Sequence, residues 1–248
     1  MTAGEWISLG SSIGALCAAV VALFTLLELS KQRKSAYKPD LCVLKNQYDI
    51  KPGTLGKVGG IPFALDWVPQ GLPQSNKHFW ATIRIVNVGF GAAKNINTKW
   101  KFDSNLLLNE VNQMAQRTFQ TFFLTEDDFF ICVKSNGKNN YRVNNKFDSF
   151  QFEYLLPIGN QPTGHDIFLP PAYTLLVAAY LFLCLIEEKS ITEMRIPTIE
   201  LDLSYEDIGN ERHDTHHKLQ GNISSITHPS NKEDKSPPEF GLEFIEIA

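Results

Sequence analysis

The stretch IRIVNVGFGAAKNINTKWKF, from Ile83 to Phe102, places the residues GFGAA between two runs in which apolar side chains recur at every second position. This period of two is typical of strands with one face in water. The apolar positions that share a parity are Phe79, Ala81, Ile83 and Ile85 before the glycines, and Ile96, Thr98, Trp100 and Phe102 after them. A phosphate-binding GxGxxG loop would need a third small residue and a following helix. We therefore expect Gly89 and Gly91 to form the corner of a hairpin or a crossover between sheets, with one of them at positive φ.

The rest of the chain carries further strand signals. Thr198 to Glu206 is the clearest, because its apolar and polar side chains alternate without interruption. FICV (130–133) and FDSFQFEYLL (147–156) also suit strands, and the pair Asn136-Gly137 between them is a turn signal. Many short strands with glycine and proline turns predict a mainly β protein, a β-sandwich with one or two short helices.

Three local assignments follow from capping and turn residues. Ser104 is expected to cap a short helix over LLLNEVNQMAQ. Thr125 is either a second helix cap or the start of a strand, and the sequence does not decide between them. Lys51 to Lys77 is rich in glycine and proline, which predicts a long irregular loop or a hairpin, with Trp67 holding it against the domain.

The N-terminus carries an uncharged run of 22 residues from Trp6 to Leu27. About 20 apolar residues in a helix cross the ~30 Å hydrocarbon core, so one membrane span is predicted, with Trp6 as an interfacial anchor. A cleaved signal peptide would carry its basic residues before the apolar run. Here the basic residues Lys31, Arg33 and Lys34 follow it, so the positive-inside rule places the N-terminus outside and residues from about 40 onward in the cytoplasm.

The predicted span also carries a stripe of small side chains. Gly10, Gly14, Ala18 and Ala22 recur every four residues and so lie along one side of a helix. Such stripes let two helices approach closely. Self-association of the span and a plain anchor are both compatible with this pattern.

A second apolar stretch, Ile167 to Ile186, runs for 20 residues without a charge. Its length would allow a second span. Pro170 and Pro171 near its start, and the absence of a basic cluster beside it, favour a buried helix or a helix with a strand. A second span would also move Thr198–Glu206 across the membrane and divide the predicted sheet.

Charge and cysteine content exclude some classes of function. Four of the 23 Lys and Arg residues and two of the 27 acids precede Pro39, which leaves 19 basic and 25 acidic residues, a net charge of −6, in the rest of the chain. A nucleic-acid-binding domain usually has a basic footprint, so no nucleic-acid partner is expected. The four cysteines show no CxxC spacing, and we expect buried free thiols in a reducing compartment.

The run HDTHH is the one histidine cluster in the sequence. His213, His216 and His217, with Asp214, are candidate zinc or copper ligands. An exposed loop or edge strand explains the same residues without a metal, and we favour it. No nucleophile elbow, phosphate loop or HExxH motif is present. We therefore expect no enzyme, no cofactor and no metal.

The motifs NVGFGAAKN (Asn87–Asn95) and YEDIGN (Tyr205–Asn210), with LPPAYTLLVAAYL between them, resemble a broad set of poorly characterised bacterial proteins. Those proteins have one N-terminal transmembrane helix, a basic stop and a cytoplasmic immunoglobulin-like β-sandwich. The resemblance implies this fold, a place in the bacterial inner membrane, and a short helix packed on the sheet at residues 171–186. It implies no catalytic residue.

These observations predict three parts: an anchor at 1–38, a β-sandwich at 39–226 and a flexible C-terminal tail at 227–248. Within the tail, FGLEFIEIA (240–248) could instead dock as a terminal strand or helix. The leading hypothesis is a single-pass membrane protein whose cytoplasmic sandwich serves as a protein-interaction or sensing module. A second is an effector that oligomerises through the span and perturbs the bilayer. A third, less favoured, is a metal-dependent hydrolase that uses the His213 region.

Overall fold

The computed structural model describes residues 2–52, 65–70, 81–127, 129–135, 138–145, 148–160, 164–227 and 239–247. The helices in this part are α1 (Ala3–Ala36), α2 (Ser104–Arg117) and α3 (Pro171–Ile186). The strands are β1 (Leu41–Val43), β2 (Asn46–Pro52), β3 (Leu65–Pro69), β4 (Thr82–Asn87), β5 (Ala93–Lys101), β6 (Phe122–Glu126), β7 (Phe130–Ser135), β8 (Lys138–Asn144), β9 (Ser149–Leu155), β10 (His165–Phe168), β11 (Ile199–Glu206), β12 (Arg212–Thr227) and β13 (Glu239–Ile247).

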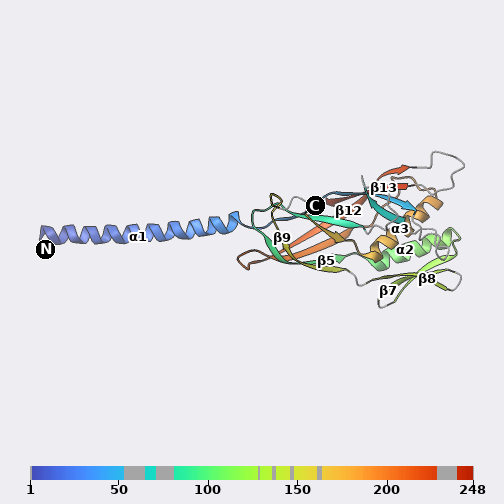
Figure 1. Cartoon of the computed structure of the whole chain (residues 1–248), viewed down its shortest axis with the longest axis horizontal. Coiled ribbons are helices and arrows are strands. Elements are labelled where there is room, and N and C mark those ends of the chain that lie inside the picture. Colours follow the sequence, from blue (N-terminus) through green and yellow to red (C-terminus); the bar gives the residue numbers. More distant parts are fainter. Residues whose placement is uncertain are drawn as a thin grey trace.

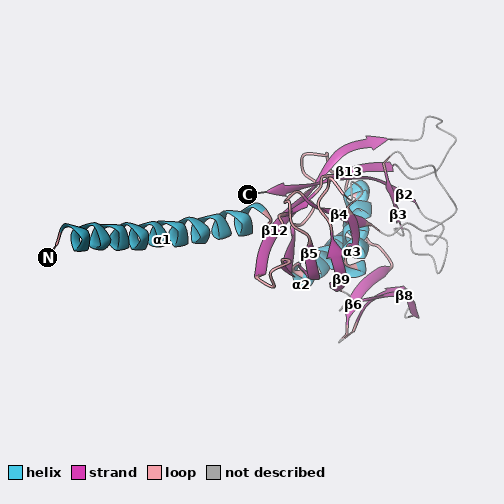
Figure 2. Cartoon of the chain, turned by 60° about the vertical axis from the view of Figure 1, so that its left-hand side comes forward, coloured by secondary structure: helices cyan, strands magenta, loops and turns pink. Residues whose placement is uncertain are grey.

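The strands form three antiparallel sheets. The largest has seven strands in the order β3-β2-β13-β12-β11-β5-β9, and the others are β1-β4-β10 and β6-β7-β8. The large sheet is curled, helices α2 and α3 lie beside each other in the β-rich body, and α1 projects from one end of it (Figures 1 and 2). The prediction of a mainly β, sandwich-like protein with two short helices and a long apolar N-terminal helix is confirmed. The immunoglobulin-like assignment remains a prediction.

The alternation found in the sequence corresponds to the core. In β11 every second side chain, from Ile199 to Tyr205, is buried, as predicted. Ile83 and Ile85 of β4 and Trp100 of β5 are also buried, whereas Phe79 lies outside the described residues. Strands β4 and β5 belong to different sheets, so the glycines between them form a crossover and not a hairpin.

The second apolar stretch is a strand followed by a buried helix. Residues 165–168 form β10, and α3 begins at Pro171, where the missing amide hydrogen costs nothing because a first-turn amide has no helical partner. Its side chains are apolar all round and nearly all buried, which is typical of a core helix. Tyr173 donates its hydroxyl to the Pro197 carbonyl at 2.7 Å. The buried-helix interpretation is confirmed, and α1 is the one helix in the described part that is long and apolar enough to cross a membrane.

Two local predictions need adjustment. Helix α2 begins at Ser104, but its cap is Asp103, whose carboxylate accepts from the Leu106 amide at 2.8 Å. A carboxylate also interacts favourably with the helix dipole, which the serine hydroxyl does not. Thr125 lies in β6, so the strand alternative holds. The turn at Asn136-Gly137 and most of the loop at 51–77 lie outside the described residues, although Trp67 is buried in β3.

The assignment of residues 227–248 to a flexible tail is wrong for 239–247. These residues form β13, which pairs with β12 on one side and with β2 on the other. Phe240, Leu242 and Phe244 are buried, and the Phe244 ring stacks on Trp67 at a centroid distance of 6.2 Å. Apolar residues at every second position supply the reason, because they give the segment one face to bury. The β-rich domain therefore extends beyond 226 to Ile247.

Candidate functional site

Helix α1 stands away from the domain. Its large apolar side chains, such as Leu16 and Phe24 at 66% exposure each, are uncovered, and none of the segment Gly10–Arg33 is buried in the described chain. The proposed anchor residues Gly10, Gly14, Ala18, Ala22, Leu27, Lys31 and Arg33 are all exposed on this helix. Trp6 and Lys34 belong to the helix, but their side chains lie outside the described part. An apolar surface of this size in water would be costly, which indicates that another apolar phase covers it.

The small-residue stripe on α1 is open. A Cβ atom built on Gly10 or Gly14 would meet no heavy atom within 4 Å. The stripe therefore contacts no other described segment of its own chain and is free to meet another helix.

The segment directly after α1, residues 37–40, packs over the GFGAA crossover. A Cβ on Gly91 would overlap the Tyr37 carbonyl oxygen, and a Cβ on Gly89 would lie 2.5 Å from the Asp40 nitrogen. Neither Gly89 nor Gly91 has a positive φ; among the described glycines only Gly164 does. The expectation of a positive φ at Gly89 or Gly91 was therefore wrong. Gly89 and Gly91 are glycines because the backbone of residues 37–40 packs against them. We call this contact the anchor junction.

Asn87 fixes the anchor junction. Its side chain is buried, with the residue 1% exposed, and makes four hydrogen bonds to backbone groups. The amide oxygen accepts from the nitrogens of Asp40 (3.1 Å) and Gly89 (3.0 Å), and the amide nitrogen donates to the carbonyls of Gly91 (2.7 Å) and Leu155 (3.1 Å). The Val88 amide also donates to the Asp40 carbonyl at 2.8 Å. One side chain thus ties the residues after α1, the crossover and the end of β9 into a unit.

A second feature lies on the outward face of the large sheet, across β5, β11 and the first half of β12. Polar side chains stand there in cross-strand rows, which we call the charged sheet face. The rows are Lys101–Glu200–Lys218, Lys99–Asp202–His216, Asn97–Ser204–Asp214 and Lys94–Glu206–Arg212. An acidic column on β11 is therefore flanked by mostly basic columns, an arrangement that favours strand pairing. A hollow of about 660 Å³ opens on this face, lined in part by Lys99, Asp202, Ser204 and His216.

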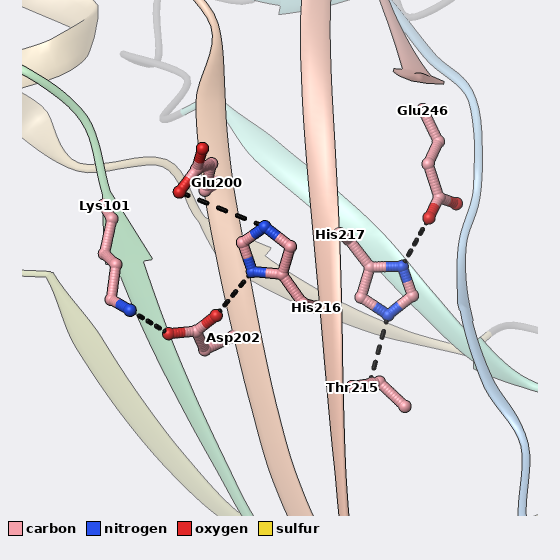
Figure 3. Close-up of polar contacts among 7 residues, drawn as sticks. All are labelled: Lys101, Glu200, Asp202, Thr215, His216, His217 and Glu246. Carbon is pink, nitrogen blue, oxygen red and sulfur yellow. Dashed lines mark hydrogen bonds and ion pairs between the residues drawn. The ribbon is translucent and has the colours of Figure 1, made fainter. Parts of the chain in front are cut away.

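Asp202 is the centre of the network on this face (Figure 3). Lys101 Nζ lies 2.6 Å from Asp202 Oδ2, and His216 Nδ1 lies 2.7 Å from Asp202 Oδ1. His216 Nε2 is 4.0 Å from Glu200 Oε2. The hydrogen bonds from Lys101 and then from His216 lower the pKa of Asp202, and the bond to Asp202 raises the pKa of Lys101. With both signs of charge paired internally, this face does not form the basic surface that a polyanion requires.

The histidine cluster does not converge on one point. His216 points outward, whereas His217, one residue later in the strand, points to the opposite face (Figure 3). His217 is buried and contacts Glu246 Oε1 at 2.8 Å, and His213 lies 3.4 Å from Asp207 Oδ2. Within the described ranges no group of three His, Cys, Asp or Glu side chains is placed to hold a metal ion. In the described part of the chain these histidines therefore do not come together as a metal centre.

Residues 212–217 do form an edge of the sheet, as the sequence suggested. They pair with β11, but pairing with β13 begins only at Lys218. Of the cysteines, Cys132 and Cys184 are buried free thiols, Cys42 is half-buried and Cys17 is exposed on α1.

Sequence reasoning did not identify Asn87 or the charged rows. Asn87 was visible as a polar residue at the end of an apolar strand directly before GxG, a pattern typical of an asparagine that bonds to the following backbone. The rows depend on the register between strands about 100 residues apart, which no local pattern contains.

Comparison with known proteins gave no match to a family model, to a curated sequence or to a solved structure.

Proposed function

We propose that this protein is a single-pass membrane protein whose β-rich domain lies in the cytoplasm, at the bacterial inner membrane, and acts as an interaction or sensing module for another protein. The observation that carries the proposal is α1. Its apolar surface is uncovered over the whole segment Gly10–Arg33. The residues after it, 37–40, pack directly on the domain at the anchor junction, so no flexible linker separates α1 from the domain. The cations Lys31 and Arg33 beside the domain support a cytoplasmic location.

The charged sheet face is the surface we assign to the partner. It combines a hollow with charges of both signs and, among the described residues, a strand edge at 212–217 that is paired only with β11. Interfaces between proteins use such mixed charges to set orientation and to exclude wrong partners. An edge of a sheet also offers backbone groups to an added strand.

Position-specific crosslinking tests this assignment. A photoreactive residue at Lys99 or Ser204 in the full chain, in its native membrane, should give one defined heterologous adduct. The charge reversal Arg212→Glu should abolish this adduct, and a photoreactive residue at Phe119, exposed after α2, should not form it. Adducts that arise equally from all three positions, or with copies of the chain alone, would refute the proposal.

The open stripe on α1 supports a second candidate, an oligomer that perturbs the bilayer. Gly14→Ile would block close approach of two helices, because the site is now empty around the glycine. This candidate predicts that Gly14→Ile reduces in-membrane crosslinking between copies and restores membrane potential during overexpression. Ala19→Ile, which lies off the stripe, should do neither. Equal behaviour of the two variants would rule the candidate out.

A further inference from the structure

The end of the domain next to α1 exposes a set of large apolar side chains, which we call the apolar rim. Phe90, between the two junction glycines, is 80% exposed, and Ile208, in the turn between β11 and β12, is 63% exposed. The other members are Tyr37, Val88 and Ile158, each more than two-fifths exposed. A contiguous apolar patch on a domain surface usually marks an interaction site.

Hydrogen bonds place these residues at one end of the molecule. Val88 bonds through its amide to Asp40, and Ile158 bonds through its amide to the Asn87 carbonyl at 2.7 Å. The turn that carries Ile208 is tied to the crossover because Lys94 donates to Asn210. In Figure 1 the turn between β11 and β12 lies at the same end of the domain as the end of α1.

Two polar side chains of the rim, Asp207 and Asn87, bond to the backbone, whereas Asp40, Asn210 and Glu211 are exposed beside the apolar ones. In the β11–β12 turn, Asp207 Oδ1 accepts from the amides of Gly209 (2.7 Å) and Glu211 (2.9 Å), so its carboxylate faces the backbone while Ile208 faces outward. Burial opposes ionisation of Asp207, but these amides and His213 lower its pKa overall. In the crossover, the Asn87 side chain likewise bonds to the backbone, at the Gly89 amide and the Gly91 carbonyl, and Phe90 lies between these two residues with its side chain exposed.

The position of the rim identifies what covers it. The uncharged run Trp6–Leu27 contains 22 residues, which in a helix span about 33 Å, close to the ~30 Å hydrocarbon core. Tyr37 follows Leu27 by ten residues, or about 15 Å along the helix axis, and the headgroup layer beyond the core is about 5–7 Å thick, so an upright α1 holds the rim just outside this layer and a tilted α1 brings one side of the rim into it. The anchor junction contains no flexible linker, so the rim cannot move far from this layer. Aromatic and aliphatic side chains at this depth enter the headgroup and acyl boundary.

We infer that the apolar rim, with Phe90 and Ile208 as its tips, inserts into the lipid interface and forms a second membrane contact that fixes the tilt of the domain. The inference rests on the proposed span of α1. The occupant is the bilayer because the rim is continuous with α1 and is flanked by Lys31, Arg33 and Lys38, which suit anionic headgroups.

Spin-label depth measurements test the inference on the full chain in vesicles of phosphatidylethanolamine and phosphatidylglycerol. Labels are attached at Phe90→Cys and Ile208→Cys in a Cys17→Ala, Cys42→Ala background, since Cys132 and Cys184 are buried. Both positions are exposed, so a label requires no repacking. Phe119→Cys, 92% exposed and next to α2, reports water, and Val21→Cys in α1 reports the hydrocarbon core.

Lipid contact predicts that labels at 90 and 208 are relaxed efficiently by oxygen and several-fold less by a water-soluble nickel chelate than the label at 119. Strong nickel relaxation at 90 and 208 would place them in water and overturn the inference. Protection from both reagents would indicate a protein contact and overturn it equally. A water-accessible label at Val21 would refute the span itself, and the inference would fail with it. If the label at Val21 lies in the hydrocarbon core, either nickel relaxation or protection from both reagents at 90 and 208 overturns this inference alone, and the proposed span of α1 still stands.

Discussion

Replacing Asn87 with alanine removes the side chain that joins the anchor to the domain. Four backbone groups then lose a hydrogen bond: the amides of Asp40 and Gly89 and the carbonyls of Gly91 and Leu155. The substitution does not change the apolar packing of β4, because Ile85 and Val86, which precede Asn87, stay buried. The effect should therefore arise from hydrogen bonding at the anchor junction.

The magnitude follows from which groups stay buried. A buried polar group left without a partner costs about 1–3 kcal/mol. The two bonds donated by the Asn87 amide are buried, whereas the two that it accepts are partly buried, so water can replace the latter. Two unsatisfied carbonyls lead us to expect a loss of roughly 3 kcal/mol in the free energy of unfolding.

Urea unfolding of the full chain in a mild detergent measures this loss. The buried Trp67 and Trp100 provide the fluorescence signal. With an m value of about 2–3 kcal/mol/M, the midpoint should fall by about 1 M or more. Asn97→Ala is the matched control, because Asn97 is exposed and donates one local bond to the Asn95 carbonyl. If Asn87→Ala shifted the midpoint no more than Asn97→Ala, the anchor junction would not be the rigid connection described above.

Two further predictions follow from the junction and the charged sheet face. Gly91→Ala should destabilise the domain by about 1–3 kcal/mol, since its Cβ overlaps the Tyr37 carbonyl oxygen, and thermal unfolding should show no such loss for Gly159→Ala, which has open space around it. Asp202→Asn should cost a small amount of stability at pH 7, because the folded-state pKa of Asp202 is lowered. That difference should vanish once the pH falls below the lowered folded-state pKa, where the carboxylate is protonated in both states, and a difference that persists there would contradict the charge argument.

Local patterns in the sequence were sufficient for the elements that alternate or that are apolar throughout. Strand β11 was assigned from its period of two, and α3 from Pro170 and Pro171 near the start of its uncharged run and from the absence of a basic cluster beside it. The sequence left β13 undecided between a flexible tail and a docked strand or helix, because eleven polar or small residues separate it from β12. Strand β13 forms by pairing with β12 on one side and β2 on the other, and the place between these two strands is set by the arrangement of the whole sheet.

The functional features depended even more on distant contacts. The motif at Asn87 was visible, but its partners Asp40 and Leu155 lie 47 and 68 residues away. Gly89 and Gly91 were singled out for the wrong reason. Close packing of another backbone segment and a positive φ both select glycine, so the sequence alone does not distinguish them. The HDTHH cluster suggested a shared site, and the period of a strand separates His216 and His217 onto opposite faces.

The central claim is that α1 crosses a membrane and holds the domain against it, and Cys17 tests it most directly. Cys17 lies near the middle of the uncharged run and is exposed on α1. With Cys42→Ala, the full chain in vesicles opened to reagent on both sides should leave Cys17 unmodified by a membrane-impermeant maleimide, while cysteines introduced at Thr2 and Ser30 are modified. In sealed inner-membrane vesicles, Ser30→Cys should react from the cytoplasmic side alone. Rapid modification of Cys17 by the impermeant reagent would place α1 in water and contradict the account.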